Sequence, residues 1–271
     1  MRSATEQFDE HYMTLLEAAR NHWWVQGMRD IGASLLGTSE DAPLDVLDAG
    51  CGTGALLPWA ATLSSPSLPI AIDVSPVAVQ RCRMTALPAV LAVGSVASLP
   101  FSNGSFDLVL SSDVLQHLTR ELADEAVAEM ARVLRPGGRL LIRTNSAHGR
   151  RDVTERDDWR LYRPAMLRAA LESAGLQVER LTPVNFVQGV WASVPRPRLR
   201  RTAEHHADAL DHTDPLVDQH REHRSLGIPE AAGSLKNWAM LRVLHAERWY
   251  LRHPGRSLPF GHSLYAVARR P

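Results

Sequence analysis

Val46-Leu-Asp-Ala-Gly-Cys-Gly-Thr-Gly54 joins the end of an apolar run to three regularly spaced glycines. A short apolar run at residues 44–48 predicts a buried strand, and residues 55–63 predict a helix directly after the glycines. Glycine has no Cβ, so such a loop can turn sharply and let a ligand lie against its backbone. The first turn of the helix offers free N–H groups and the positive end of a dipole. The stretch therefore predicts a strand, a loop and a helix that bind a carboxylate or a phosphate.

The spacing of the glycines separates two classes of cofactor. Gly50, Gly52 and Gly54 give G-x-G-x-G, whereas dinucleotide-binding folds use G-x-G-x-x-G. Asp48 would repel a pyrophosphate but can bind an ammonium group, and S-adenosylmethionine carries an amino group and a sulfonium. Asp73 ends the next predicted strand, where a carboxylate can accept both ribose hydroxyls. The alternative is an ordinary glycine turn with an unrelated surface aspartate; the combined pattern favours S-adenosylmethionine.

The chain around this loop alternates short apolar runs with helical patterns. Such alternation predicts an α/β fold with a Rossmann-like, mostly parallel sheet of seven strands covered by helices on both faces. Arg135-Pro-Gly-Gly138 predicts a turn before the fifth strand. Residues 262–268 are expected to return to the sheet as an edge strand. The other strands are predicted at residues 44–48, 68–73, 90–94, 106–111, 139–144 and 176–183, and helices at residues 55–63, 76–87, 121–134 and 164–174.

Four segments together resemble class I S-adenosylmethionine-dependent methyltransferases. They are residues 46–54, Ile72-Asp-Val-Ser-Pro76, residues 99–118 and Arg132-Val-Leu-Arg-Pro-Gly-Gly-Arg139. The resemblance covers residues 44–184 and implies that the region after the third strand meets the adenine, while the region after the fourth strand holds the methionine part. The family often has an acidic residue where Ser95 stands, and serine can bond the adenine amino group only more weakly. The cofactor-binding residues that follow are Asp48, Gly50, Cys51, Gly52, Gly54, Asp73, Val74, Ser95, Val96, Ser112 and Gln116.

The two ends of the chain resemble one branch of this family. His22-Trp-Trp-Val-Gln-Gly-Met-Arg29 is similar to the N-terminal His-Trp-Trp motif of that branch, although Val25, Gln26 and Met28 depart from it. Its members act on varied small molecules, so the likeness narrows the fold and leaves the substrate open. We expect residues 1–40 to form a helical lid, 41–189 the cofactor-binding core, 190–258 a helical insert that covers the substrate or makes an oligomer contact, and 259–271 the C-terminal strand of the core.

Candidate catalytic residues follow from the needs of methyl transfer. In-line transfer from a sulfonium mainly requires that the acceptor is aligned and water is excluded, and a general base is needed only if the acceptor must lose a proton. His117 follows the fourth predicted strand at the carboxyl edge of the sheet, where open α/β sheets bind ligands. Its alternative role is that of a core histidine packing the start of a helix. Tyr12 and His22 lie in the predicted lid, and their alternative is an ordinary amphipathic helix face.

Composition restricts the partners. Lys+Arg and Asp+Glu both number 30, so no overall basic field exists to hold nucleic acid or an anionic membrane. The first residues lack the apolar core of a signal peptide, no apolar run reaches the length of a membrane span, and the only two cysteines are Cys51 and Cys82. We therefore expect a cytoplasmic protein. The histidines at residues 205–223 favour a solvated helix face over a metal site, so no metal is expected.

Three functions remain open at this point. The first is methylation of a small molecule at O, N or C, for which antibiotic or other specialised-metabolite biosynthesis is a plausible setting. The second is an RNA or protein methyltransferase. The neutral charge disfavours it, and so does the lack of an Asn-Pro-Pro-Tyr-like tetrapeptide after the fourth strand, where the sequence is Ser111-Ser-Asp-Val114. The third is a fold that binds the cofactor but acts as a cyclase or a scaffold. A homodimer is an open alternative for the late insert, and only a small-molecule substrate is expected as a partner.

Overall fold

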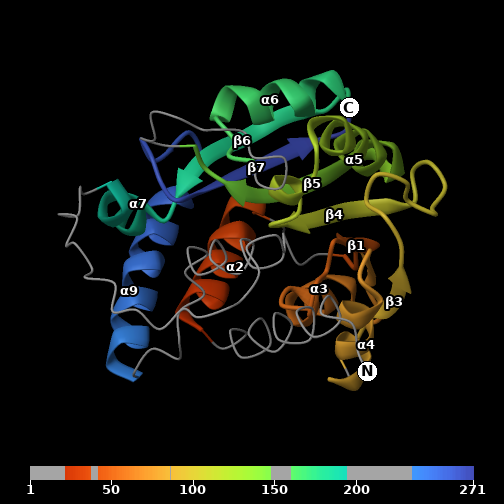
Figure 1. The fold of residues 1–271 in the computed structure, drawn as a ribbon, viewed down its shortest axis with the longest axis horizontal. Coiled ribbons are helices and arrows are strands. Elements are labelled where there is room, and N and C mark those ends of the chain that lie inside the picture. The colour runs from red at the N-terminus through yellow and green to blue at the C-terminus, as the bar shows by residue number, and fades with distance from the viewer. Residues whose placement is uncertain (1–21, 38–41, 86, 148–159, 194–233) are drawn as a thin grey trace, which may run out of the picture.

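The molecule is built on one seven-stranded sheet with the strand order β3-β2-β1-β4-β5-β7-β6. The computed structural model describes residues 22–37, 42–85, 87–147, 160–193 and 234–271 (Figure 1). All neighbouring strands pair in parallel except β7, which is antiparallel to β5 and to β6. The predicted Rossmann-like fold is therefore confirmed. The strands are β1 (Val46–Ala49), β2 (Ile70–Asp73), β3 (Val90–Val93), β4 (Phe106–Ser112), β5 (Leu134–Asn145), β6 (Gln177–Val184) and β7 (Ser263–Arg269).

The expectation that residues 262–268 form an edge strand is wrong. β7 lies between β5 and β6, and six of its seven residues are buried. β6 is the edge strand instead, and its first half alternates between exposed and partly buried residues. An apolar run that is buried on both faces belongs inside a sheet. The apolar run indicates that the strand is buried on both faces. Which strands lie beside it depends on pairings between residues that are far apart in the sequence.

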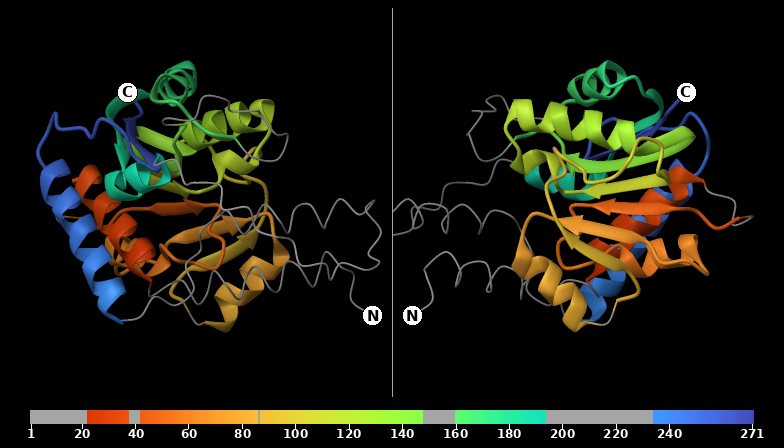
Figure 2. Two further views of the ribbon diagram at one scale, coloured as in Figure 1. Left: turned by 60° about the vertical axis from the view of Figure 1, so that its left-hand side comes forward. Right: turned by 90° about the vertical axis from the view of Figure 1, so that its right-hand side faces the viewer.

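Helices cover both faces of the sheet (Figure 2). One apolar cluster joins α5 and α6 to one face, and a second joins α2, α3 and α9 to the other. α4 begins at Pro76, as the predicted helix over residues 76–87 does, and the Ser75 hydroxyl caps it. The described helices are α2 (Trp23–Leu36), α3 (Leu57–Ser64), α4 (Pro76–Met84), the 3₁₀ turn η2 (Leu115–His117), α5 (Arg120–Val133), α6 (Pro164–Ser173), α7 (Phe186–Ser193) and α9 (Ser234–Leu251).

Helices α2 and α9 lie side by side although they are far apart in the sequence (Figure 1). A Cβ on Gly27 would lie 2.3 Å from Cδ1 of Leu244, so the contact depends on glycine. The Trp23 N–H donates to Asn237 Oδ1 at 2.8 Å across 214 residues of sequence. The described parts of the expected lid and of the expected insert thus form one layer on the sheet. How the two segments act on a substrate stays a prediction.

The predicted turn at residues 135–138 lies within β5. Phe106 pairs with Leu134, but the next pair is Leu108 with Arg139, so the intervening residues of β5 bulge outward. Gly137 has φ +83°, a value that favours glycine. Arg135 holds the bulge through ion pairs with Asp107 at 2.7 Å and Asp45 at 2.8 Å. The turn is therefore real, and β5 continues through it.

Candidate functional site

The loop after β1 has the tight backbone that its glycines predict. Both Gly50 N–H and Cys51 N–H donate to the carbonyl oxygen of Ile72, at 2.8 and 3.0 Å, which fastens the loop to β2. Gly50 has φ +85°, and a Cβ there would lie 2.2 Å from Cγ2 of Val114. Gly52 also has positive φ, but a Cβ there would meet no atom within 4 Å. The backbone at Gly52 therefore faces open space, where a ligand can lie against it.

Asp48 is a buried carboxyl group beside this loop. It lies near the end of β1, the residue is 1% exposed, and Oδ2 has no hydrogen-bond partner among the described residues. Burial, and then the negative charge of Asp73, raise the pKa of Asp48 to about 7. A buried carboxylate without a partner is unstable until a cation or a donor reaches it. The ammonium group of S-adenosylmethionine fits this requirement.

Asp73 is held rigidly at the carboxyl end of β2. Its Oδ2 accepts the Gly52 N–H at 2.8 Å and its Oδ1 accepts the Ser75 N–H at 2.9 Å. An ionised carboxylate offers about four acceptor positions, so two remain for the hydroxyls of a ribose. The adjacent Val74 is 73% exposed. This geometry is compatible with the predicted roles of Asp73 and Val74, and an exposed apolar side chain here fits an adenine ring.

The remaining predicted cofactor residues differ in their surroundings. Cys51 is buried with Cys82, whose thiol donates to the Gly52 carbonyl at 3.2 Å from beneath the loop. Ser95 is exposed and its hydroxyl accepts the Ala97 N–H at 3.2 Å, while Val96 is buried. Gln116 is buried, and its Oε1 accepts the Thr144 hydroxyl at 2.9 Å. That bond ties η2 to β5, so Gln116 has a structural role whether or not it meets a ligand.

An ion pair that the sequence did not reveal lies where β4 ends. Asp113 has φ +58°, which is uncommon for a residue other than glycine and often marks a functional site. Its carboxylate is paired with Arg143 of β5, through Nη2 and through Nε at 3.2 Å. The next residue, Val114, contacts Gly50. The ion pair of Asp113 with Arg143 therefore lies next to Val114, which contacts the glycine loop, and beside a space that Arg143 lines.

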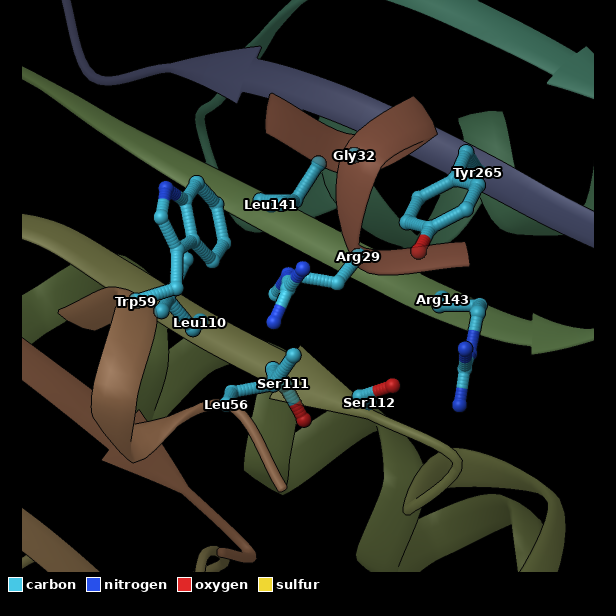
Figure 3. Close-up of a pocket in the computed structure, with 10 residues that line it drawn as sticks. All are labelled: Arg29, Gly32, Leu56, Trp59, Leu110, Ser111, Ser112, Leu141, Arg143 and Tyr265. Atoms are coloured by element: carbon cyan, nitrogen blue, oxygen red, sulfur yellow. The ribbon is translucent and has the colours of Figure 1, made fainter. Parts of the chain in front are cut away.

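That space is a pocket beneath α2 (Figure 3). Arg143 lies opposite Ser112 of β4 and opposite Tyr265 of β7, which makes a polar row across three strands. Burial raises the pKa of Tyr265 to about 12, and the neutral phenol donates to the Met28 carbonyl at 2.8 Å. Figure 3 shows Arg29 extending across the pocket toward Trp59, with Ser112 and Arg143 at its other end. The lining residues are Arg29, Gly32, Leu56, Trp59, Leu110, Ser111, Ser112, Leu141, Arg143 and Tyr265.

The candidate catalytic residues are not gathered in this pocket. His117 lies on η2 and is exposed, so it is not buried in the core, and its role as a base stays a prediction. His22 is buried and caps α2, with Nδ1 accepting the Trp24 N–H at 3.2 Å. Tyr12 falls outside the described residues, as do the histidines at residues 205–223. Sequence reasoning missed Arg29, Trp59, Asp113 and Arg143; the one available signal was a charged residue that ends the apolar run of β5.

The described residues contain neither a candidate membrane span nor a candidate metal site. None of the helices in the described ranges is long and apolar enough to cross a membrane. Within the same ranges, no cluster of three or more histidine, cysteine, aspartate or glutamate side chains could hold a metal ion.

Comparisons with known proteins identify the core of the chain. Residues 47–142 match the methyltransferase domain family. A malonyl-[acyl-carrier protein] O-methyltransferase from Hahella chejuensis is 37% identical over 135 residues, which are 47% of this chain and 46% of that protein. A probable S-adenosylmethionine-dependent methyltransferase from Mycolicibacterium smegmatis is 33% identical over 139 residues, covering 50% of this chain and 52% of that protein. The chain thus spans about half the length of these curated relatives.

Solved structures support the same fold. An S-adenosylmethionine-dependent methyltransferase from Thermotoga maritima superposes with a TM-score of 0.57 at 13% identity, covering 97% of each chain. The site agrees with this likeness, because the open backbone at Gly52 and the carboxylates of Asp48 and Asp73 suit the cofactor that these proteins use. The core of the chain is therefore similar to S-adenosylmethionine-dependent methyltransferases, with residues 47–142 matching their domain family and the described residues adopting the class I fold.

Proposed function

We propose that the chain transfers the methyl group of S-adenosylmethionine to O, N or C of a small-molecule acceptor. One observation carries the proposal: Asp48 is buried, its Oδ2 has no partner among the described residues, and it adjoins a glycine backbone that faces open space. A fold that needed no cationic ligand would gain stability from a neutral residue at this position. Antibiotic or other specialised-metabolite biosynthesis remains our proposed setting, and a cytoplasmic location remains part of the proposal.

The chain's own residues divide the work of binding. Asp48 would hold the ammonium group, Asp73 the ribose hydroxyls, and Val74, Ser95 and Val96 the adenine. When bound, the cofactor supplies an electrophilic methyl group on a sulfonium. The rigid Asp73 carboxylate and the fastened loop keep the binding groups in place before any ligand arrives, which reduces the entropy lost on binding.

The pocket beneath α2 is the best candidate for the acceptor. Its residue Arg143 is paired with Asp113, and the next residue, Val114, contacts the glycine loop. The cavity measures only about 10 Å³, room for about one water molecule, so its walls must move apart to admit an acceptor. The side chain of Arg143 is only 11% exposed, and its pairing with Asp113 keeps the cation fixed. The proposed task of these groups is to orient the acceptor and to exclude water, which is the main requirement of methyl transfer.

A general base is part of the proposal only for an acceptor that must lose a proton. His117 and His22 remain the candidates, together with Tyr12. His22 can act only through Nε2 while its Nδ1 caps α2. Full turnover in a His117→Ala variant would remove that residue from the list.

The experiment is incubation of the protein with S-adenosylmethionine labelled in its methyl group and with separate pools of cell metabolites, RNA and protein. Label in the metabolite pool, and its absence with an Asp48→Asn variant, is the expected result. Label only in RNA, or only on the amino-acid side chains of proteins, would refute the small-molecule acceptor. Label on a small group that is attached to a carrier protein would not. Tight cofactor binding without transfer to any pool would favour a cyclase or a scaffold. The cyclase outcome has a structural counterpart, since the fold also superposes on the [4+2]-cyclase SpnF with a TM-score of 0.55 at 20% identity.

A further inference from the structure

The outward side of α9 exposes large aromatic side chains next to arginines. Trp238 and Trp249 are each 57% exposed and Leu235 is 76% exposed. These residues, with Arg242 and with Arg252 directly after the helix, recur at the spacing that places side chains on one side of a helix. Leu244 and Leu251 are buried on the opposite side, toward α2. We call the five exposed residues the Trp/Arg face.

The arginines of this face are arranged to bind carboxylates. The Arg242 guanidinium lies 5.3 Å from the ring centre of Trp238, and that of Arg252 lies 5.8 Å from the ring centre of Trp249. Stacking uses the flat face of a guanidinium and leaves its N–H groups available to planar acceptors. The only acidic residue of α9 is Glu247, which is buried and accepts the N–H groups of Asn185 and Phe186. The Trp/Arg face therefore carries positive charge that α9 does not neutralise.

The charge of the Trp/Arg face disfavours a second copy of this chain as its occupant. Two such faces in contact would bring arginines against arginines, and like charges across an interface oppose association. Exposed tryptophan and arginine are instead the residue types that anchor protein interfaces, and the charge selects an acidic partner.

The Trp/Arg face begins at the end of the sheet where the acceptor pocket lies. Asn237, next to Trp238, accepts the Trp23 N–H, and the ring of Trp24 lies 6.0 Å from the Arg143 guanidinium. We propose that the Trp/Arg face docks the acidic surface of a carrier protein that presents the methyl acceptor to the pocket. This inference rests on the proposed function, with the acceptor then a small group attached to a carrier. The H. chejuensis relative, named for malonyl-[acyl-carrier protein], fits such a substrate.

The test measures binding by calorimetry to a panel of acidic acyl carrier proteins. The unmodified chain should bind at least one carrier, with an affinity that falls by about tenfold between low and physiological salt. An Arg242→Glu/Arg252→Glu variant should bind about 100-fold more weakly, since two attractive charges become repulsive. Arg168→Glu is the matched control, because Arg168 is an exposed arginine of α6 on the other face of the sheet. It should leave the affinity unchanged.

Further measurements keep this inference separate from the proposed function. Both arginine variants should bind S-adenosylhomocysteine as the unmodified chain does, which reports an intact cofactor site. No binding to any carrier, or equal binding by the double variant, would overturn the docking proposal while leaving cofactor binding in place. Loss of binding to RNA or to anionic lipid vesicles in the double variant, without carrier binding, would overturn it as well. Failure of the unmodified chain to bind S-adenosylhomocysteine would overturn the proposed function itself.

Discussion

Replacement of Asp48 by asparagine should stabilise the protein without ligand and weaken cofactor binding at the same time. The side chain is 1% exposed and its Oδ2 has no partner among the described residues, so the ionised form exists in the folded protein at a cost. Asparagine has nearly the same shape and carries no charge. The two effects have one cause, which makes the pair of measurements more informative than either alone.

The size of the effect follows from the pKa. Burial and the charge of Asp73 raise the pKa of Asp48 from its ordinary value of 3.8 to about 7. The folded state therefore holds this proton more tightly than the unfolded state, and folding stability falls as the pH rises from 3.8 toward 7. At about 1.36 kcal/mol for each pH unit, ionisation of Asp48 destabilises the folded protein by at most about 4 kcal/mol above pH 7. The Asp48→Asn variant would not incur this loss.

Denaturant unfolding at several pH values measures the stability, and calorimetry with S-adenosylhomocysteine measures the affinity. At pH 8 the Asp48→Asn variant should be more stable by a few kcal/mol, and the difference should shrink toward pH 4. The affinity of the unmodified protein should fall by about tenfold from pH 7.5 to pH 6, because only the carboxylate attracts the ammonium group. Asp124→Asn on α5 is the control, since Asp124 is exposed and should change neither quantity.

A variant that is no more stable than the unmodified protein at pH 8 would show that Asp48 has a partner when ionised. An affinity that does not depend on pH between 6 and 8 would show that the ammonium group lies elsewhere. Either result would refute the reasoning from burial.

Four further predictions concern the loop, the helices and the base. Gly52→Ala should be modestly destabilised, because its φ of +52° strains a residue with a Cβ although that Cβ would meet no atom within 4 Å, and it should bind S-adenosylhomocysteine far more weakly. Gly50→Ala should be destabilised more, because its φ is +85° and its Cβ would also lie 2.2 Å from Cγ2 of Val114; thermal unfolding and calorimetry separate the two. Asp73→Ala should lower the affinity by about 1–3 kcal/mol, and an unchanged value by calorimetry would mean that the ribose lies elsewhere. Gly27→Ala should destabilise the fold through its clash with Leu244, and adding Leu244→Ala should recover part of the loss; additive effects in a double-mutant cycle would contradict the contact. His117→Ala should lower turnover by about 100-fold or more if His117 is the base, measured on the labelled acceptor.

The cofactor loop was predictable because its signals are local. A strand, three glycines and a helix start follow one another directly in the sequence, and the carboxylate at Asp48 needs only the strand around it to be buried. The acceptor pocket was not predictable in the same way. Arg143 reads in the sequence as a charge at the end of a strand, and it becomes a buried group only because α2 covers it and Asp113 pairs with it. Neither neighbour is near it in the chain.

The packing of α2 against α9 could not be predicted from the sequence for a related reason. Gly27 looks like a weak point in a helix, since glycine lowers helix propensity. Only the structure shows that the glycine leaves room for the side chain of Leu244. The position of β7 shows the same limit, because an apolar run predicts that a strand is buried but does not predict which strands lie beside it.

The place of β7 in the sheet has a consequence for synthesis on the ribosome. β6 is made earlier than β7, yet it can reach β5 only through β7. Until residues 263–269 emerge, β5 presents an open hydrogen-bonding edge and β6 has no strand to pair with. Unpaired edges of this kind attract other chains. The nascent protein therefore exposes unpaired strand edges for as long as the residues between Val184 and Ser263 take to be translated. During that interval it should need chaperones more than the finished molecule does.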